Sequence, residues 1–86
     1  MNNDLALMLR ELANKSQKEV FQDAIREMGA EAFAAWAMDK NGDTVLDIGS
    51  KLECHAADVK RYKNRAERIL NAHQRAYELA RSISDI

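Results

Sequence analysis

Apolar residues recur every three or four positions over most of the chain, which is the spacing of amphipathic helices. A first helix is predicted over residues 4–14, with one apolar face formed by Leu5, Met8, Leu9 and Leu12. A second helix is predicted to start at Gln17, because Ser16 and Glu19 have the S-x-x-E spacing of a capping box. Its apolar face continues through residues 20–28. The start of the chain therefore predicts two short amphipathic helices.

Two glycines mark changes of direction. Gly29 follows the second helix at a position where a left-handed residue would end it, but residues 30–38 resume a helical composition at once. The helix is therefore expected either to stop or to kink at Gly29. Asn41-Gly42 is the strongest turn signal in the chain. We expect short helices over residues 1–38 and the main reversal of direction at residues 39–43.

After the turn, the residues of one helical face recur in steps of three and four from Val45 to Ile83 without a change of register. This pattern predicts one helix over residues 44–85, about 60 Å long at 1.5 Å per residue. A break near residues 54–58, with Asp58 capping a new helix, is the alternative. Continuity is favoured because a loop is expected to shift the register.

These elements predict an all-α protein in which short N-terminal helices pack on a long C-terminal helix, as a helical bundle or a coiled-coil-like dimer. The short helices are expected on residues 45–62, which leaves the rest of the long helix uncovered. We expect this uncovered surface, the C-terminal seam, to pair with a second copy or to receive another protein. The C-terminal seam comprises Ala66, Ile69, Leu70, His73, Ala76, Tyr77, Ala80 and Ile83.

Composition agrees with a helical protein of one domain, residues 1–86, because the chain has no proline and only three glycines. Its apolar runs are shorter than the roughly 18 residues of a membrane span. The N-terminal residues lack the positive charge of a signal peptide. The single cysteine, Cys54, allows no internal disulfide and no cysteine-rich zinc site. A cytoplasmic protein without membrane contact is expected.

The turn resembles part of a calcium-binding EF-hand loop. Asp39, Asn41 and Asp43 fall at the first, third and fifth ligand positions. Thr44 replaces the glycine of the sixth position, and Ser50 replaces the bidentate glutamate that closes the calcium site. We favour a turn followed by a helix cap at Asp43 or Thr44, with the three ligand-like residues as a weak metal candidate. No cofactor is expected.

Motifs for catalysis are absent from the sequence, which has no glycine-rich phosphate loop, no H-E-x-x-H and no nucleophile elbow. Cys54 and His55 are neighbours, but adjacent side chains on a helix point about 100° apart. His55 and His73 would lie about 27 Å apart on an unbroken helix, too far to share a metal within one chain. We expect no catalytic residue, and therefore no enzyme.

Charge is unevenly distributed along the chain. Residues 1–54 carry ten acids and six bases, whereas residues 55–86 carry four acids and seven bases. The basic half has arginines at seven-residue spacing with further cations beside them, namely Arg61, Arg68, Arg75, Arg65, Lys60 and Lys63. Glu67 and Glu78 interrupt the neighbouring positions. The leading hypothesis is a small regulatory protein that binds another protein, as an adaptor or inhibitor, through its long C-terminal helix. The alternative is a nucleic-acid-binding helical dimer that uses the arginines.

Overall fold

The computed structural model describes residues 3–84, and this part of the chain contains helices and no strands. The helices are α1 (Asn3–Ala13), α2 (Gln17–Met28), α3 (Ala30–Lys40), α4 (Val45–Leu52) and α5 (Ala56–Ser84). The predicted all-α class, with short helices packed on a long C-terminal helix, is confirmed. Within residues 3–84, no helix combines the length and the apolar character that a membrane span requires.

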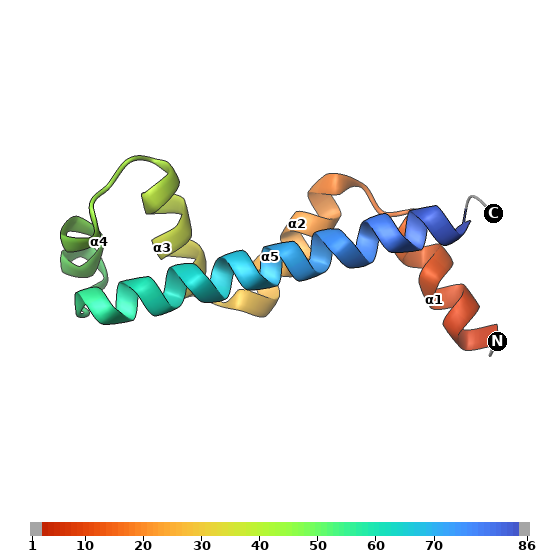
Figure 1. Cartoon of the computed structure of the whole chain (residues 1–86), viewed down its shortest axis with the longest axis horizontal. Coiled ribbons are helices and arrows are strands. Elements are labelled where there is room, and N and C mark those ends of the chain that lie inside the picture. Colours follow the sequence, from red (N-terminus) through yellow and green to blue (C-terminus); the bar gives the residue numbers. More distant parts are fainter. Residues whose placement is uncertain (1–2, 85–86) are drawn as a thin grey trace.

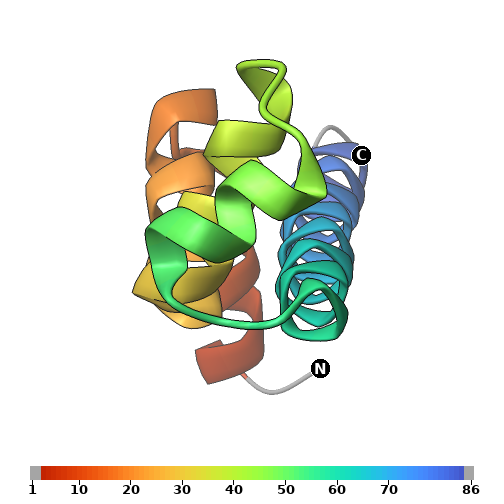
Figure 2. The same cartoon turned by 90° about the vertical axis from the view of Figure 1, so that its left-hand side faces the viewer.

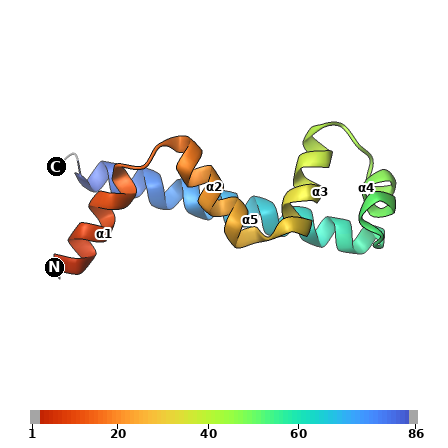
Figure 3. The same ribbon diagram turned by 180° about the vertical axis from the view of Figure 1, so that it is seen from behind.

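Helix α5 forms the long axis of the molecule, and the four shorter helices lie along it in reverse order (Figure 1). Helix α1 lies near the C-terminal end of α5 and α4 lies at its N-terminal end, as the view from behind also shows (Figure 3). Seen along the long axis, α5 occupies one side of the molecule and the shorter helices occupy the other (Figure 2). The resulting shape measures 49 × 21 × 14 Å. One side of α5 is therefore covered along much of its length, and the opposite side is open.

Capping residues begin and end the helices largely as the sequence predicts. The Ser16 hydroxyl accepts a hydrogen bond from the Glu19 amide (3.2 Å), so the predicted capping box starts α2 at Gln17. Gly29, with φ +90°, separates α2 from α3, which decides for a stop rather than a kink. The Thr44 hydroxyl accepts from the amide of Asp47 (3.2 Å) and caps α4.

The predicted unbroken helix over residues 44–85 is wrong over the described residues, since α4 and α5 are separate helices; residue 85 lies outside the part that the structure describes. Glu53 takes the left-handed conformation (φ 55°, ψ 47°) at the end of α4. The Cys54 amide then donates to the Gly49 carbonyl (2.9 Å). On the α5 side, the backbone amide of His55 donates to the carboxylate of Asp58 (3.2 Å). Asp58 thus acts from the first turn of α5, close to the alternative that placed a break at residues 54–58.

The apolar register survives the break because both helices bury their faces in one cluster. Ile48 of α4 and Val59 of α5 are fully buried beside Ala35 of α3. Each of the two larger side chains contributes about 1.5–3 kcal/mol on burial. A short connection that returns the chain to the same core keeps the apolar spacing that a continuous helix would have.

A second cluster joins α2 and α3 to the middle of α5. Its buried members are Ala24, Met28, Ala32, Ala66 and Ile69. The Tyr62 side chain packs against both clusters and connects them into one core. The expectation that the N-terminal helices cover only residues 45–62 is therefore wrong. Near the C-terminal end, the Tyr77 hydroxyl donates to the carbonyl of Lys15 (2.8 Å), which fixes the link between α1 and α2 on α5.

Gly49 explains the close approach of α4 to the connection that follows it. A Cβ at this position would lie 2.9 Å from the Cys54 carbonyl oxygen and 3.6 Å from Val59. We expect Gly49→Ala to lower the free energy of unfolding by about 1–3 kcal/mol, because this crowding outweighs the roughly 1 kcal/mol that alanine gains in a helix. Urea unfolding would measure the change, with Ser50→Ala as the exposed control. A Gly49→Ala protein as stable as wild type would contradict the close contact.

The link between α1 and α2 carries an ion pair that predicts acid sensitivity. The Lys15 ammonium lies 2.6 Å from the Asp23 carboxylate, and this hydrogen bond lowers the pKa of Asp23 below 3.8. The resulting stabilisation is present above pH 3.8 and is lost as the pH falls through the pKa of the folded state. Asp23→Asn should therefore be less stable than wild type at neutral pH, and the two should converge in acid. Unfolding midpoints across pH would test this against Glu67→Gln, an exposed control; parallel curves for wild type and Asp23→Asn would contradict it.

Candidate nucleic-acid interface

The C-terminal seam is largely covered within the chain, contrary to the expectation that it is left for a partner. Ala66, Tyr77 and Ala80 are at most 2% exposed, and Ile69 is 7% exposed. Leu70 and His73 are half-buried, whereas Ala76 and Ile83 are exposed. Helices α1 and α2 cover this part of α5 because they run beside its C-terminal half (Figure 1).

The face of α5 opposite the core carries alternating arginine and asparagine side chains. This Arg–Asn stripe consists of Arg61, Asn64, Arg68, Asn71 and Arg75, all exposed. Its members recur in steps of three and four, so they share one side of the helix. The sequence analysis found the three arginines but missed Asn64 and Asn71, although these have the same seven-residue spacing.

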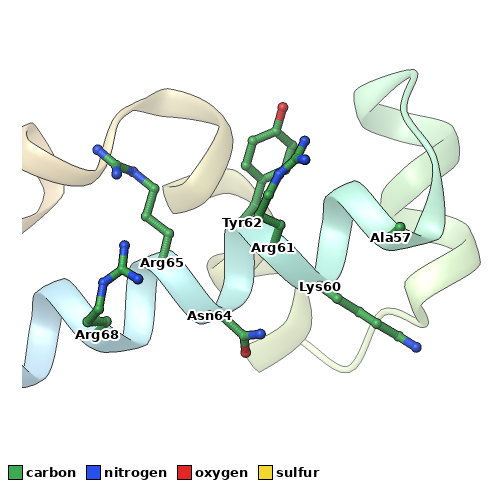
Figure 4. Close-up of a pocket in the computed structure, with 7 residues that line it drawn as sticks. All are labelled: Ala57, Lys60, Arg61, Tyr62, Asn64, Arg65 and Arg68. Atoms are coloured by element: carbon green, nitrogen blue, oxygen red, sulfur yellow. The ribbon is translucent and has the colours of Figure 1, made fainter.

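A shallow hollow of about 550 Å³ runs along the N-terminal half of this face. All of its lining residues belong to α5: Ala57, Lys60, Arg61, Tyr62, Asn64, Arg65 and Arg68 (Figure 4). In Figure 4, Arg65 and Arg68 rise from one edge of the helix, whereas Lys60 and Asn64 leave from the other. The hollow lies between cationic side chains and has no acidic residue in its lining.

Four of the six predicted basic residues remain on the surface. The Arg61 guanidinium pairs with the Asp58 carboxylate and lies 5.9 Å from the ring centre of Tyr62, yet its side chain is 71% exposed. Lys60, Arg68 and Arg75 are exposed, and none of the three makes an ion pair within the part of the chain that the structure describes. Their positive charge is thus available to a ligand.

The other two predicted binding residues form contacts within the fold. Arg65 donates through Nε to the Met28 carbonyl (3.1 Å) and through Nη2 to the Glu27 carbonyl (3.2 Å). These carbonyls belong to the last turn of α2, which lacks intrahelical donors for them. The Lys63 ammonium lies 3.0 Å from the Asp39 carboxylate and connects α5 to α3. Local sequence spacing could not reveal these roles, since the partners lie far away along the chain.

The metal candidate at the turn directs its carboxylates toward lysines. Asp39 pairs with Lys63, and Asp43 pairs with Lys51 (2.9 Å). The hydrogen bond from Asp43 raises the pKa of Lys51 above 10.5. Among residues 3–84, no group of three or more His, Cys, Asp or Glu side chains is placed to hold a metal ion. The structure thus does not assemble Asp39, Asn41 and Asp43 into a cation site.

Comparison of the chain with protein-family models, curated protein sequences and solved structures finds no match. The function therefore has to be argued from the geometry of its surfaces.

The structural role of Arg65 can be separated from binding. Arg65→Gln removes the charged donor that spans two α2 carbonyls, and we expect the free energy of unfolding to fall by about 1 kcal/mol. Arg68→Gln, three residues along the same helix, should change it by less than about 0.5 kcal/mol because its side chain makes no ion pair in the described structure. Urea denaturation of both variants would check this. Equal losses would show that Arg65 is not a special contact.

Proposed function

We propose that this protein is a non-catalytic nucleic-acid-binding protein that contacts its ligand through the exposed face of α5. The observation that carries the proposal is the Arg–Asn stripe on the side of α5 that faces away from the core. A stripe of cations on an open helix face fits a polyanion, because each phosphate neutralised by Arg or Lys releases a bound counterion.

The chemical character of this face favours nucleic acid over a protein partner. Interfaces with nucleic acid are polar and positively charged, whereas protein interfaces generally have an apolar, often aromatic, centre. The Arg–Asn stripe contains no apolar side chain. An adaptor or inhibitor role for the long helix relied on its apolar seam, and that seam is largely covered by α1 and α2. The protein-binding hypothesis therefore comes second.

The spacing of the stripe suits a ligand with many regularly placed phosphates. Arg61, Arg68 and Arg75 follow one another at about 10.5 Å along the helix axis. A DNA duplex presents one negative charge per roughly 1.7 Å of its axis, so each guanidinium has a phosphate within reach. Arginine and asparagine are also the side chains that pair with the edges of guanine and adenine in the major groove. The shorter helices do not obstruct this approach, because they lie on the other side of α5 (Figure 2).

The overall charge sets the conditions under which binding is expected. The formal net charge is −1, and Glu67 and Glu78 are exposed beside the stripe. Long-range attraction to nucleic acid is therefore small, and the affinity depends on the local contacts of the arginines. Binding should be tightest at low salt.

Fluorescence anisotropy with a labelled duplex, repeated over a series of salt concentrations, tests the proposal. The logarithm of the association constant should fall linearly with the logarithm of the salt concentration, with a slope of about −0.9 for each phosphate contacted. Replacing Arg61, Arg68 and Arg75 together by glutamine should weaken binding by at least about tenfold at low salt and make the slope shallower by about three contacts.

A control of equal charge change separates this face from simple electrostatics. Arg10, Lys18 and Lys40 are exposed cations on α1, α2 and α3, and their combined replacement by glutamine also removes three charges. We expect this control protein to bind nearly as wild type does. Absence of binding even at low salt, or an equal loss in the control, would overturn the proposal; in the first case an acidic protein surface becomes the next ligand to test.

A further inference from the structure

Helix α1 carries an apolar groove that the rest of the chain leaves uncovered. The groove has a volume of about 430 Å³ and is lined by Leu5, Met8, Leu9 and Leu12. Leu5 and Met8 are 53% and 62% exposed. Helix α1 diverges from α5, so its N-terminal half stands away from the bundle (Figures 1 and 3). Contiguous exposed apolar residues of this kind mark contact surfaces in soluble proteins.

A second exposed apolar surface lies on the last turns of α5. We call it the terminal stripe, and it consists of Ala72, Ala76, Leu79 and Ile83, spaced by four, three and four residues. Leu79 is 61% exposed and Ile83 is 41% exposed. The terminal stripe lies between the Arg–Asn stripe and the buried face of α5. Since α1 packs near the C-terminal end of α5, the groove and the terminal stripe occur at the same end of the molecule (Figure 1).

The two apolar surfaces have flanks of opposite charge. Glu11 lies beside the α1 groove and is exposed. Arg75 lies beside the terminal stripe and is also exposed, with no ion pair in the described residues. Complementary charge at the edges of two apolar surfaces favours their mutual contact and fixes its register.

We propose that the α1 groove receives the terminal stripe of a second copy of this chain, and that the contact is reciprocal in a two-fold dimer. Because both surfaces lie at one end of the molecule, a single two-fold axis at that end allows α1 of each copy to contact α5 of the other. Area supports the two-fold form. Helix α1 has 11 residues and is about 16 Å long, and one face of such a helix is smaller than the roughly 800 Å² per partner of a stable interface. Reciprocity doubles the contact.

This inference does not rest on nucleic-acid binding, and its test contains no nucleic acid. Sedimentation equilibrium of the full chain, from low micromolar to millimolar concentration, should give a monomer–dimer equilibrium. Met8→Glu and Leu79→Glu should each raise the dissociation constant by at least about tenfold, because each would bury an unpaired carboxylate in the interface. Leu46→Glu is the matched control: Leu46 is 79% exposed on α4, at the other end of the molecule, and its substitution should leave the equilibrium unchanged.

A charge exchange identifies which surfaces meet. Glu11→Arg and Arg75→Glu should each weaken the dimer, and the protein with both substitutions should regain it, because the attraction across the interface is restored with its sign reversed. Circular dichroism and urea unfolding of every variant verify that the fold is retained, as expected for exposed positions.

Three results would overturn the proposal. A monomer at every concentration would mean that a different protein, or nothing, covers the groove. A dimer that Met8→Glu and Leu79→Glu leave unchanged would place the interface elsewhere. Species that keep growing with concentration would indicate a head-to-tail contact that does not close.

Discussion

The close packing of alanines between α5 and the helices beside it is the interaction on which the rest of the structure depends. Ala24, Ala32 and Ala66 are at most 2% exposed and lie in one cluster, and Ala35 is fully buried in the other. Small side chains at these positions allow neighbouring helix backbones to approach closely. The larger residues Met28, Ile69 and Tyr62 then fill the space around the contact points. A chain of 86 residues has little core to spare, so this close approach is what lets four short helices cover one long helix.

Covering one side of α5 determines what the other side does. The apolar residues of the long helix are needed to hold α1 to α4, so the open side is left with polar and cationic residues. Arg65 stands at the boundary between the two sides. Its backbone belongs to the basic half of the helix, yet its guanidinium completes the last turn of α2. The same helix therefore acts both as the support of the fold and as the surface that it presents to a ligand.

The break between α4 and α5 shows why an apolar repeat is an ambiguous signal. Ile48 and Val59 have the spacing of one continuous helix, but they meet across a turn in the same cluster with Ala35. A repeat reports which residues are buried, and several backbone paths can bury the same residues. The left-handed Glu53 and the contact of Gly49 with the Cys54 carbonyl select the turned path, and neither has a strong local sequence signature.

The sequence by itself determined the helical class, the start of α2 at the Ser16 capping box, the end at Gly29 and the turn at Gly42, because each depends on interactions within a few residues. It also placed three arginines of the candidate interface on one side of a helix, since helical spacing alone fixes that. Only the tertiary structure decided the break after Leu52, the burial of Tyr77 and Ala80, and the bonding of Arg65 and Lys63. These features arise from contacts between residues far apart along the chain, and local spacing carries no information about such partners.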